Sequence, residues 1–436
     1  MLNWIWLGMV LAAVLIAGAN GQMKAVADGA VNGAEAAVTI SLGLIGVMTV
    51  WMGIMRLAER SGFIHLVARA MRPILRWLFP EVPHDHPAMG SMVMNIAANM
   101  LGLINAATPL GLRAMRDLER LNPHPGTATN AMCTFLAINT GSVQLIPITA
   151  IGVLAAAGSQ SPYAIVGTAL IATCFSSTAG LIAVKTFEKM RAFAPGPAAS
   201  ERKEEAAGPV EEVQLAPERE PLKLWQGAVL FAFLGFFVWA IYAAATTPVA
   251  GAGNDEGIGF VQIVNAISIA AIPFLLVFFP LYAALKGVRI YEELVEGGKE
   301  GFTVAIKIIP YLVMILLAIF MLRESGGIDL ITQAVRPALE AVGFPPELLP
   351  MGLMRPLSGS GSLGIFTELV KEFGPDSLIV RMAGTIYGST ETTFYVIAVY
   401  FGSVGVRRTR HAIPAGLIAD LAGIIASVIV CRMMFG

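Results

Sequence analysis

Nine apolar stretches recur along this chain, and each is long enough to cross a lipid bilayer as an α-helix. The hydrocarbon core of a bilayer is about 30 Å thick, so a crossing helix needs roughly 20 mostly apolar residues. The pattern therefore predicts an all-α polytopic membrane protein with about nine membrane crossings. The predicted spans are residues 2–19, 37–58, 127–157, 161–185, 224–246, 258–286, 301–322, 376–402 and 411–435.

The composition agrees with this class and argues against others. Of 436 residues, 56% are hydrophobic and 14% are charged, whereas soluble domains carry about 25% charged residues. Lys and Arg number 29 against 30 Asp and Glu, so the basic excess of a nucleic-acid-binding protein is missing. The chain carries no catalytic, dinucleotide or zinc-ligand motif. We therefore expect no enzyme activity, no cofactor, no bound metal and no nucleic-acid partner.

Two further apolar stretches, residues 88–112 and 347–370, are interrupted by Gly, Asn, Ser and Pro. Irregular backbone at membrane depth is tolerated only where protein covers it or where it lines a wet cavity. These two stretches are therefore predicted to be re-entrant hairpins rather than full spans.

The orientation follows from the distribution of basic residues, which accumulate in cytoplasmic loops. Arginines cluster within 56–76, 113–120 and 407–410, whereas 156–162 and 247–257 contain neither Lys nor Arg. This distribution predicts a cytoplasmic amino terminus and a carboxyl terminus on the opposite side.

A segment with no hydrophobic period, residues 191–221, is rich in Pro, Ala, Glu and Arg. Such a composition is typical of a solvated, disordered linker, which the orientation places in the cytoplasm. The linker divides the chain into a first repeat, residues 1–190, and a second part, residues 222–436. The span at 224–246 is predicted to be a connector that precedes the second repeat.

The two parts of the chain resemble each other in sequence. ERSGFIHLVARAMRPIL at 59–75 aligns without a gap with RESGGIDLITQAVRPAL at 323–339, and GSVQ at 141–144 aligns with GSTE at 388–391. In the predicted topology, corresponding spans cross the membrane in opposite directions. Two inverted-topology repeats with interrupted helices are the architecture of secondary transporters, whose site lies near the bilayer midplane.

Polar residues in the broken spans and hairpins are the candidate functional residues, because polar groups inside a membrane are costly. Gly and Pro interrupt INTGSVQLIP (138–147), and Gly interrupts IYGSTETTFY (386–395). An interrupted helix exposes backbone dipoles to a solute. The candidate solute ligands are Asn95, Asn99, Asn139, Ser142, Gln144, Arg355, Ser358, Ser360, Ser389, Thr390, Glu391 and Thr392.

Two carboxylates within predicted spans, Glu391 and Asp420, are candidates for coupling transport to an ion. Arg355 has two candidate partners, the Glu391 carboxylate or a carboxylate on the solute. The competing interpretation of the small hydroxyl residues is close packing between transmembrane helices. For Asp420 the alternative is a partner in helix packing.

Several motifs carry a family resemblance: RLAERSG and LRESGGIDLI, then MRPLSGSGSLG and GSTETTFYVIAVYFGSVGVRRTRHAIPAGLIADL. The chain resembles the spore maturation proteins A and B fused into one. Those proteins belong to the nucleoside-recognition, or Gate, superfamily, which is similar to parts of the concentrative nucleoside transporters and of ferrous iron transporter B. The resemblance implies two Gate repeats, A-like then B-like, in a bacterial cytoplasmic membrane. Gln144 stands where the second repeat has Glu391.

Together these observations predict a secondary transporter of a small polar solute that is nucleoside-like, an amino acid or a carboxylate. Protons or sodium ions are the candidate coupling ions, and a homo-oligomer is compatible with the sequence. The alternative is a non-transporting membrane protein that supports spore or cell-envelope maturation through protein partners.

Overall fold

The structure is a computed structural model that describes residues 2–83, 86–101, 104–194, 222–246, 260–341 and 343–436. The regular elements within these ranges are helices. The first part of the chain forms α1 (Leu2–Asn20), α2 (Met23–Arg60), α3 (Phe63–Leu78), α4 (Pro87–Met100), α5 (Ile104–Arg120), α6 (Asn130–Gly141), α7 (Ile148–Ala156), α8 (Ile165–Phe187) and the 3₁₀ turn η1 (Arg191–Phe193). The second part forms α9 (Leu224–Thr246), α10 (Phe260–Leu285), α11 (Ile290–Glu324), α12 (Gly327–Ala341), η2 (Pro346–Leu348), α13 (Leu349–Met354), α14 (Gly359–Phe373), α15 (Leu378–Ser389), α16 (Thr393–Ser403) and α17 (Ala412–Phe435).

The predicted all-α membrane architecture is confirmed, and each of the nine predicted spans coincides with a helix or an interrupted helix pair. By length and composition, α2, α8, α9, α10 and α17 are each apolar enough to cross a membrane unaided. The predicted linker, from residue 195 onward, and the predicted loop at 247–257 lie outside the described residues.

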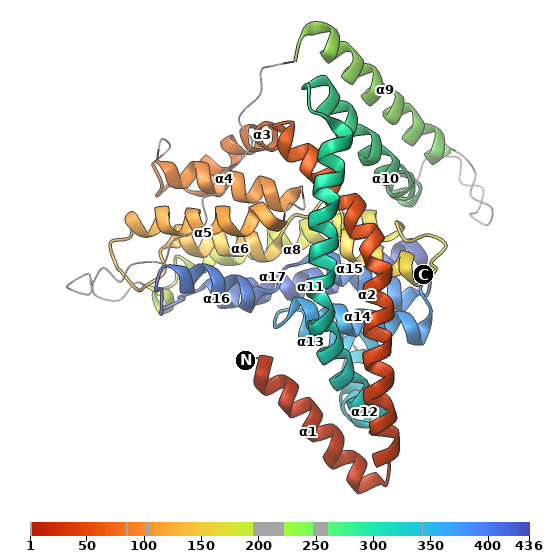
Figure 1. The fold of residues 1–436 in the computed structure, drawn as a ribbon. Helices are drawn as coiled ribbons and strands as arrows, with labels where there is room; N and C mark the ends of the chain where they lie inside the picture. The colour runs from red at the N-terminus through yellow and green to blue at the C-terminus, as the bar shows by residue number, and fades with distance from the viewer. Residues whose placement is uncertain (1, 84–85, 102–103, 195–221, 247–259, 342) are drawn as a thin grey trace.

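The longest helices, α2 and α11, run side by side across the molecule (Figure 1). Their glycines make this packing close: a Cβ on Gly33 would lie 2.8 Å from Leu316 O, and one on Gly53 would lie 2.6 Å from Leu294 O. The contacts pair the start of one helix with the end of the other, so α2 and α11 are antiparallel.

The structure differs from the sequence-based interpretation at α2. A span at 37–58 was expected, yet Met23–Arg60 forms one continuous helix that begins 14 residues earlier. The region has no proline, and glycine breaks a helix less strongly than proline does. Contact with α11 stabilises the glycine positions, so the helix continues through them.

The predicted inverted repeat is present in the local conformations. Gly62 and Gly326 both adopt the left-handed region, with φ of 76° and 79°, immediately before the amphipathic helices α3 and α12. The preceding serines repeat the same contact, because Ser61 Oγ donates to Ala58 O and Ser325 Oγ donates to Leu322 O. Equivalent residues therefore form equivalent turns in the two repeats.

Two corresponding helices near the middle of the molecule, α8 and α17, also pack against each other. A Cβ on Gly180 would lie 2.9 Å from the Ala419 side chain, and Thr168 and Cys431 both contact Thr385. The start of α8 thus lies near the end of α17. Like α2 and α11, these two helices are antiparallel, as an inverted repeat requires.

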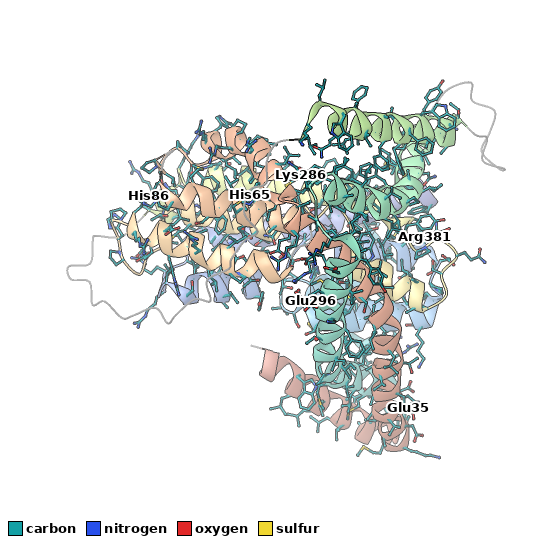
Figure 2. The ribbon with its side chains drawn as sticks, turned by 45° about the horizontal axis from the view of Figure 1, so that its top comes forward. Glu35, His65, His86, Lys286, Glu296 and Arg381 are labelled. Atoms are coloured by element: carbon teal, nitrogen blue, oxygen red, sulfur yellow. The ribbon has the colours of Figure 1, made fainter. Side chains whose placement is uncertain are left out.

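Charged groups connect α2 and α11 at one end of the pair. Arg56 Nε donates to Glu293 Oε2 over 2.7 Å, and Arg56 also pairs with Glu300. Figure 2 shows Glu296 in this part of α11, whereas Glu35 marks the far end of α2. The ion pairs thus connect α2 and α11 at one end of the pair, and close glycine contacts connect the two helices along the rest of their length.

Candidate functional site

Two interrupted helices form the centre of the molecule. The first runs as α6, breaks over residues 142–147 and resumes as α7, while the second runs as α15, breaks over 390–392 and resumes as α16. Ser142 carries the first break with φ of 25°, a conformation that is uncommon for a residue with a side chain. Both predicted interruptions are therefore present.

The two interruptions contact each other across the repeats. Glu391 N donates a hydrogen bond of 2.8 Å to Thr140 O. The close approach depends on the lack of a side chain at Gly388, since a Cβ there would lie 2.6 Å from the Pro147 side chain. The GST and GSVQLIP segments, which are 247 positions apart in the alignment, thus meet in space.

Each interruption is also bound to the hairpin of its own repeat. In the first repeat Leu145 N, within the interruption, donates to Met100 O over 3.3 Å. In the second, Phe394 N, in the first turn of α16 just after the interruption, donates to Pro356 O over 3.0 Å. Met100 ends α4 and Pro356 follows α13, so each hairpin contributes one backbone carbonyl. Hairpins and interruptions together form one chain of contacts through the protein.

Helices α8 and α17 satisfy polar groups that the breaks leave free. An α-helix ends with backbone carbonyls that have no partner within the helix. Thr173 Oγ1 donates to Gly141 O and Ser142 O over 2.9 Å and 2.8 Å. At the corresponding position of the second repeat, Asp420 Oδ2 accepts a hydrogen bond of 2.6 Å from Thr393 Oγ1.

Arg355 is a buried cation at the second hairpin, with 3% of its surface exposed. It donates to Thr390 O and, over 3.4 Å, to Thr392 Oγ1, and its guanidinium lies 4.8 Å from the centre of the Tyr387 ring. Among the described side chains it forms no ion pair with Glu391, one of its two candidate partners. Its hydrogen bonds hold the Thr390 carbonyl and the Thr392 hydroxyl, on either side of Glu391.

An amide cluster occupies the first repeat. Asn99 Nδ2 donates to Asn139 Oδ1 over 2.8 Å, and Asn95 Nδ2 donates to Ala107 O and to Tyr400 Oη over 2.7 Å and 3.2 Å. Tyr400 Oη in turn donates to Asn139 Oδ1 over 3.4 Å. The three predicted asparagines therefore come together, and Tyr400 of the second repeat completes the cluster.

The other predicted residues have distinct positions. Ser358 caps α14 by accepting from Gly361 N, and Ser360 lies 3.3 Å from it, Oγ to Oγ. Ser389 is fully buried and donates to Ile386 O. Glu391 and Gln144 are half-buried at the two interruptions. The predicted set thus divides into helix caps, packing hydroxyls and groups that face the breaks.

Sequence reasoning missed Tyr400 and Tyr387, and it did not connect Thr393 with Asp420. Thr393 was noted as part of the interrupted segment, but nothing in the sequence links it to Asp420, 27 positions away. Tyr400 lies within an apolar run, where a tyrosine reads as an ordinary interfacial residue. A buried tyrosine hydroxyl needs a hydrogen-bond partner, and this requirement is the one signal that could have marked it.

Several buried polar atoms at the centre have no hydrogen-bond partner among the described residues. They are Arg355 Nε, Thr390 Oγ1, Asp420 Oδ1 and Asn95 Oδ1. Buried polar groups are nearly always paired with protein or water. The set includes both donors and acceptors. Within the described part of the chain, no three His, Cys, Asp or Glu side chains gather as metal ligands.

Comparison with known proteins identifies relatives of each part of the chain. Spore maturation protein B of Bacillus subtilis is 47% identical over 175 residues, which cover 40% of this chain and 98% of that protein. Spore maturation protein A of the same organism is 42% identical over 187 residues, which cover 43% of this chain and 95% of that protein. The chain therefore contains almost the whole length of each relative.

Among solved structures, the YdaH transporter of Alcanivorax borkumensis matches with a TM-score of 0.42 and 16% sequence identity. The match covers 90% of this chain and 85% of that chain. The Gate family model, described as nucleoside recognition, matches residues 41–184 and 305–407, which include both interruptions. Because this match covers more than half of the sequence, the chain belongs to the Gate nucleoside-recognition family.

Proposed function

We propose that this protein is a secondary transporter that binds a small polar solute between its two interrupted helices. One observation carries the proposal: the interruptions meet through Glu391 and Thr140, and buried polar atoms on the interruptions, hairpins and α17 have no hydrogen-bond partner among the described residues. Unpaired polar groups buried in a membrane protein are costly, so they are retained where a solute or ion uses them. The inverted repeat supports the same function, because exchanging the conformations of its two halves gives an inward and an outward state.

The chemistry of the centre defines the solute class. Arg355 and the Thr390 hydroxyl suit a carboxylate group, while the Asn95 and Asn99 amides suit the polar edge of a nucleoside-like ring. An amino acid would use both kinds of group. The family description, nucleoside recognition, supports a polar organic solute. The half-buried Glu391 and the buried Asp420 are the groups through which a proton or sodium ion would be coupled.

The first experiment is thermal unfolding of the purified protein in detergent with nucleosides, amino acids, dicarboxylates and divalent metals. A ligand that binds the folded state raises the apparent stability. We expect one class to raise the unfolding temperature, and Glu391→Gln to remove that shift without lowering the unfolding temperature of the free protein. Glu296→Gln is the matched control, because Glu296 is exposed on α11 and, among the described residues, forms an ion pair with Lys299 alone.

Uptake into proteoliposomes then tests transport itself. Wild-type protein and Glu296→Gln should accumulate the solute in response to an imposed proton or sodium gradient, whereas Glu391→Gln should not. If Glu391→Gln accumulates the solute with the same dependence on the gradient, Glu391 has no role in coupling.

The second candidate is a non-transporting protein that supports spore or envelope maturation through protein partners. The similarity to the two spore maturation proteins favours it. The two candidates respond differently to apolar substitution at the interruptions. Thr392→Val in the chromosomal copy should abolish a transport-dependent phenotype but leave a partner-dependent phenotype intact.

A further inference from the structure

A single carboxyl group lies sealed behind the second interruption. Asp420 is 1% exposed on α17, between two glycines that bring this helix against the breaks. A Cβ on Gly416 would lie 2.7 Å from the Thr393 side chain, and one on Gly423 would lie 2.7 Å from the Thr390 side chain. Asp420 is thus enclosed by protein rather than by lipid or water.

The hydrogen bonds of this carboxyl group are incomplete. Oδ2 accepts from Thr393 Oγ1 over 2.6 Å. Within the described part of the chain, Oδ1 has no partner at hydrogen-bond distance and no cation lies within ion-pair distance, while the Thr390 hydroxyl is a further neighbour of this carboxyl group. A buried carboxylate without a paired cation is strongly disfavoured, and a neutral carboxylic acid is not. An added proton on Oδ1 would remove the charge and supply a donor.

We propose that Asp420 binds and releases the coupling proton of this protein, and that Arg355 is the cation that stabilises it once ionised. The O–H bond at Oδ1 forms or breaks in a conformation in which water reaches this group, and no other bond forms or breaks. The proposal deepens the transport function proposed above and rests on it for its purpose. It assigns the proton to Asp420 and leaves the half-buried Glu391 to face the solute.

The surroundings of Asp420 explain how a proton would move the protein. The charged groups that act on it are Arg355 of the second hairpin and Glu391 of the interruption, while α8 contributes the Ser176 hydroxyl, which is bonded to Ala419 O. Arg355 now donates to Thr390 O and Thr392 Oγ1. Ionised Asp420 attracts the guanidinium, so loss of the proton weakens these bonds and loosens the second interruption.

The first repeat has no such response. At the position that matches Asp420 it carries Thr173, whose hydroxyl bonds Gly141 O and Ser142 O and does not titrate. A change of protonation at this position therefore acts directly on the second interruption alone, and it reaches the first only through the contact between the two. Because only one repeat titrates at this position, binding of a proton can favour one of the two transport states, inward-facing or outward-facing, over the other.

The test is pH-difference infrared spectroscopy of the full-length protein in lipid, which detects the C=O stretching band of a protonated carboxylic acid. We expect a titrating band in the wild type that is lost in Asp420→Asn and retained in Glu391→Gln. Thr393→Val removes the hydrogen bond to Oδ2 and should shift the band without removing it. This variant decides the question if Asp420→Asn does not fold.

A band that persists in Asp420→Asn, that disappears in Glu391→Gln or that does not shift in Thr393→Val overturns the assignment. The measurement needs no solute, so its outcome is separate from that of the transport assays. A titrating Asp420 in a protein that moves no solute would refute the transport function alone. Solute uptake with no Asp420 band would refute the proton site alone.

Discussion

The backbone hydrogen bond from Glu391 N to Thr140 O joins the two interrupted helices at the point where both lose their regular structure. Each residue belongs to a different repeat, and each interruption is also bound to its own hairpin. A change at one break is therefore transmitted to the other through one main-chain contact. In the transport cycle proposed above, this contact would lengthen or be exchanged, because alternating access requires the two halves to adopt opposite conformations in turn.

Arg355 should be a stabilising residue as well as a candidate ligand. In Arg355→Met the Thr390 carbonyl and the Thr392 hydroxyl lose their buried donor, which costs about 1–3 kcal/mol of unfolding free energy. Arg355→Lys should recover only part of this, because an ammonium cannot reproduce the planar, forked donors of a guanidinium. Thermal unfolding in one detergent measures both variants.

The control for Arg355 is Arg289→Met, since the Arg289 side chain is 81% exposed. Exposed ion pairs contribute little to stability, so this variant should unfold at nearly the wild-type temperature. Equal losses in Arg355→Met and Arg289→Met would show that the bonds to the interruption do not stabilise the fold.

Gly111 should tolerate no side chain, because a Cβ there would overlap the Tyr400 hydroxyl. Gly111→Ala should displace Tyr400 from Asn95 and Asn139, and overpacking of this kind costs about 1–3 kcal/mol. Gly90→Ala on α4 is the matched control, because a Cβ there meets nothing within 4 Å. Gly111→Ala should unfold at a clearly lower temperature than Gly90→Ala. Equal unfolding temperatures would contradict the close packing of Tyr400 on Gly111 in the amide cluster.

The arrangement of basic residues predicts on which side of the membrane each loop lies. Gln160 and Arg408 are both exposed, in the α7–α8 and α16–α17 connections. In a background without Cys133, Cys174 and Cys431, a cysteine at Gln160 should react with a membrane-impermeant thiol reagent in intact cells. A cysteine at Arg408 should react only after the cells are permeabilised. Labelling of the Arg408 position in intact cells, with the Gln160 position labelled only after permeabilisation, would show that the orientation is opposite to the one proposed.

Much of this architecture could be predicted because it rests on local rules. Span length, glycine and proline positions and the alignment of Ser61-Gly62 with Ser325-Gly326 each fix a helix, a break or a turn through nearby residues. The continuity of α2 was not predictable in this way, because contacts with α11, more than 200 positions away, stabilise its glycines.

The candidate site was predictable only as a set of positions. The sequence indicated which segments are interrupted, and therefore which polar residues come near the centre. It could not indicate that Arg355 binds a backbone carbonyl rather than Glu391, since main-chain carbonyls carry no sequence signal. Nor could it bring Tyr400 to Asn95, because 305 positions separate them and their contact depends on how α16 packs on α5.

The contact between Asp376 and the α7–α8 loop should make stability depend on pH. The carboxylate accepts a hydrogen bond of 2.6 Å from Ser159 Oγ and one of 3.0 Å from Gln160 N. These two hydrogen bonds, the one from Ser159 above all, lower the pKa of Asp376 from its ordinary value of 3.8. A carboxyl group whose folded-state pKa is lowered stabilises the fold above its unfolded-state pKa. The contribution disappears as the pH falls through the lowered value.

Asp376→Asn should therefore unfold at a lower temperature than the wild type near pH 7, and the gap should close in acid. The gap should be small, because this carboxylate is close to solvent and exposed charges are screened. Ser159→Ala removes the stronger of the two bonds and should reproduce part of the loss, and the double variant should resemble Asp376→Asn, since both act through one contact. A gap that stays constant with pH would mean that the Asp376 side chain acts through its shape rather than its charge, because only an ionised group loses its contribution on protonation.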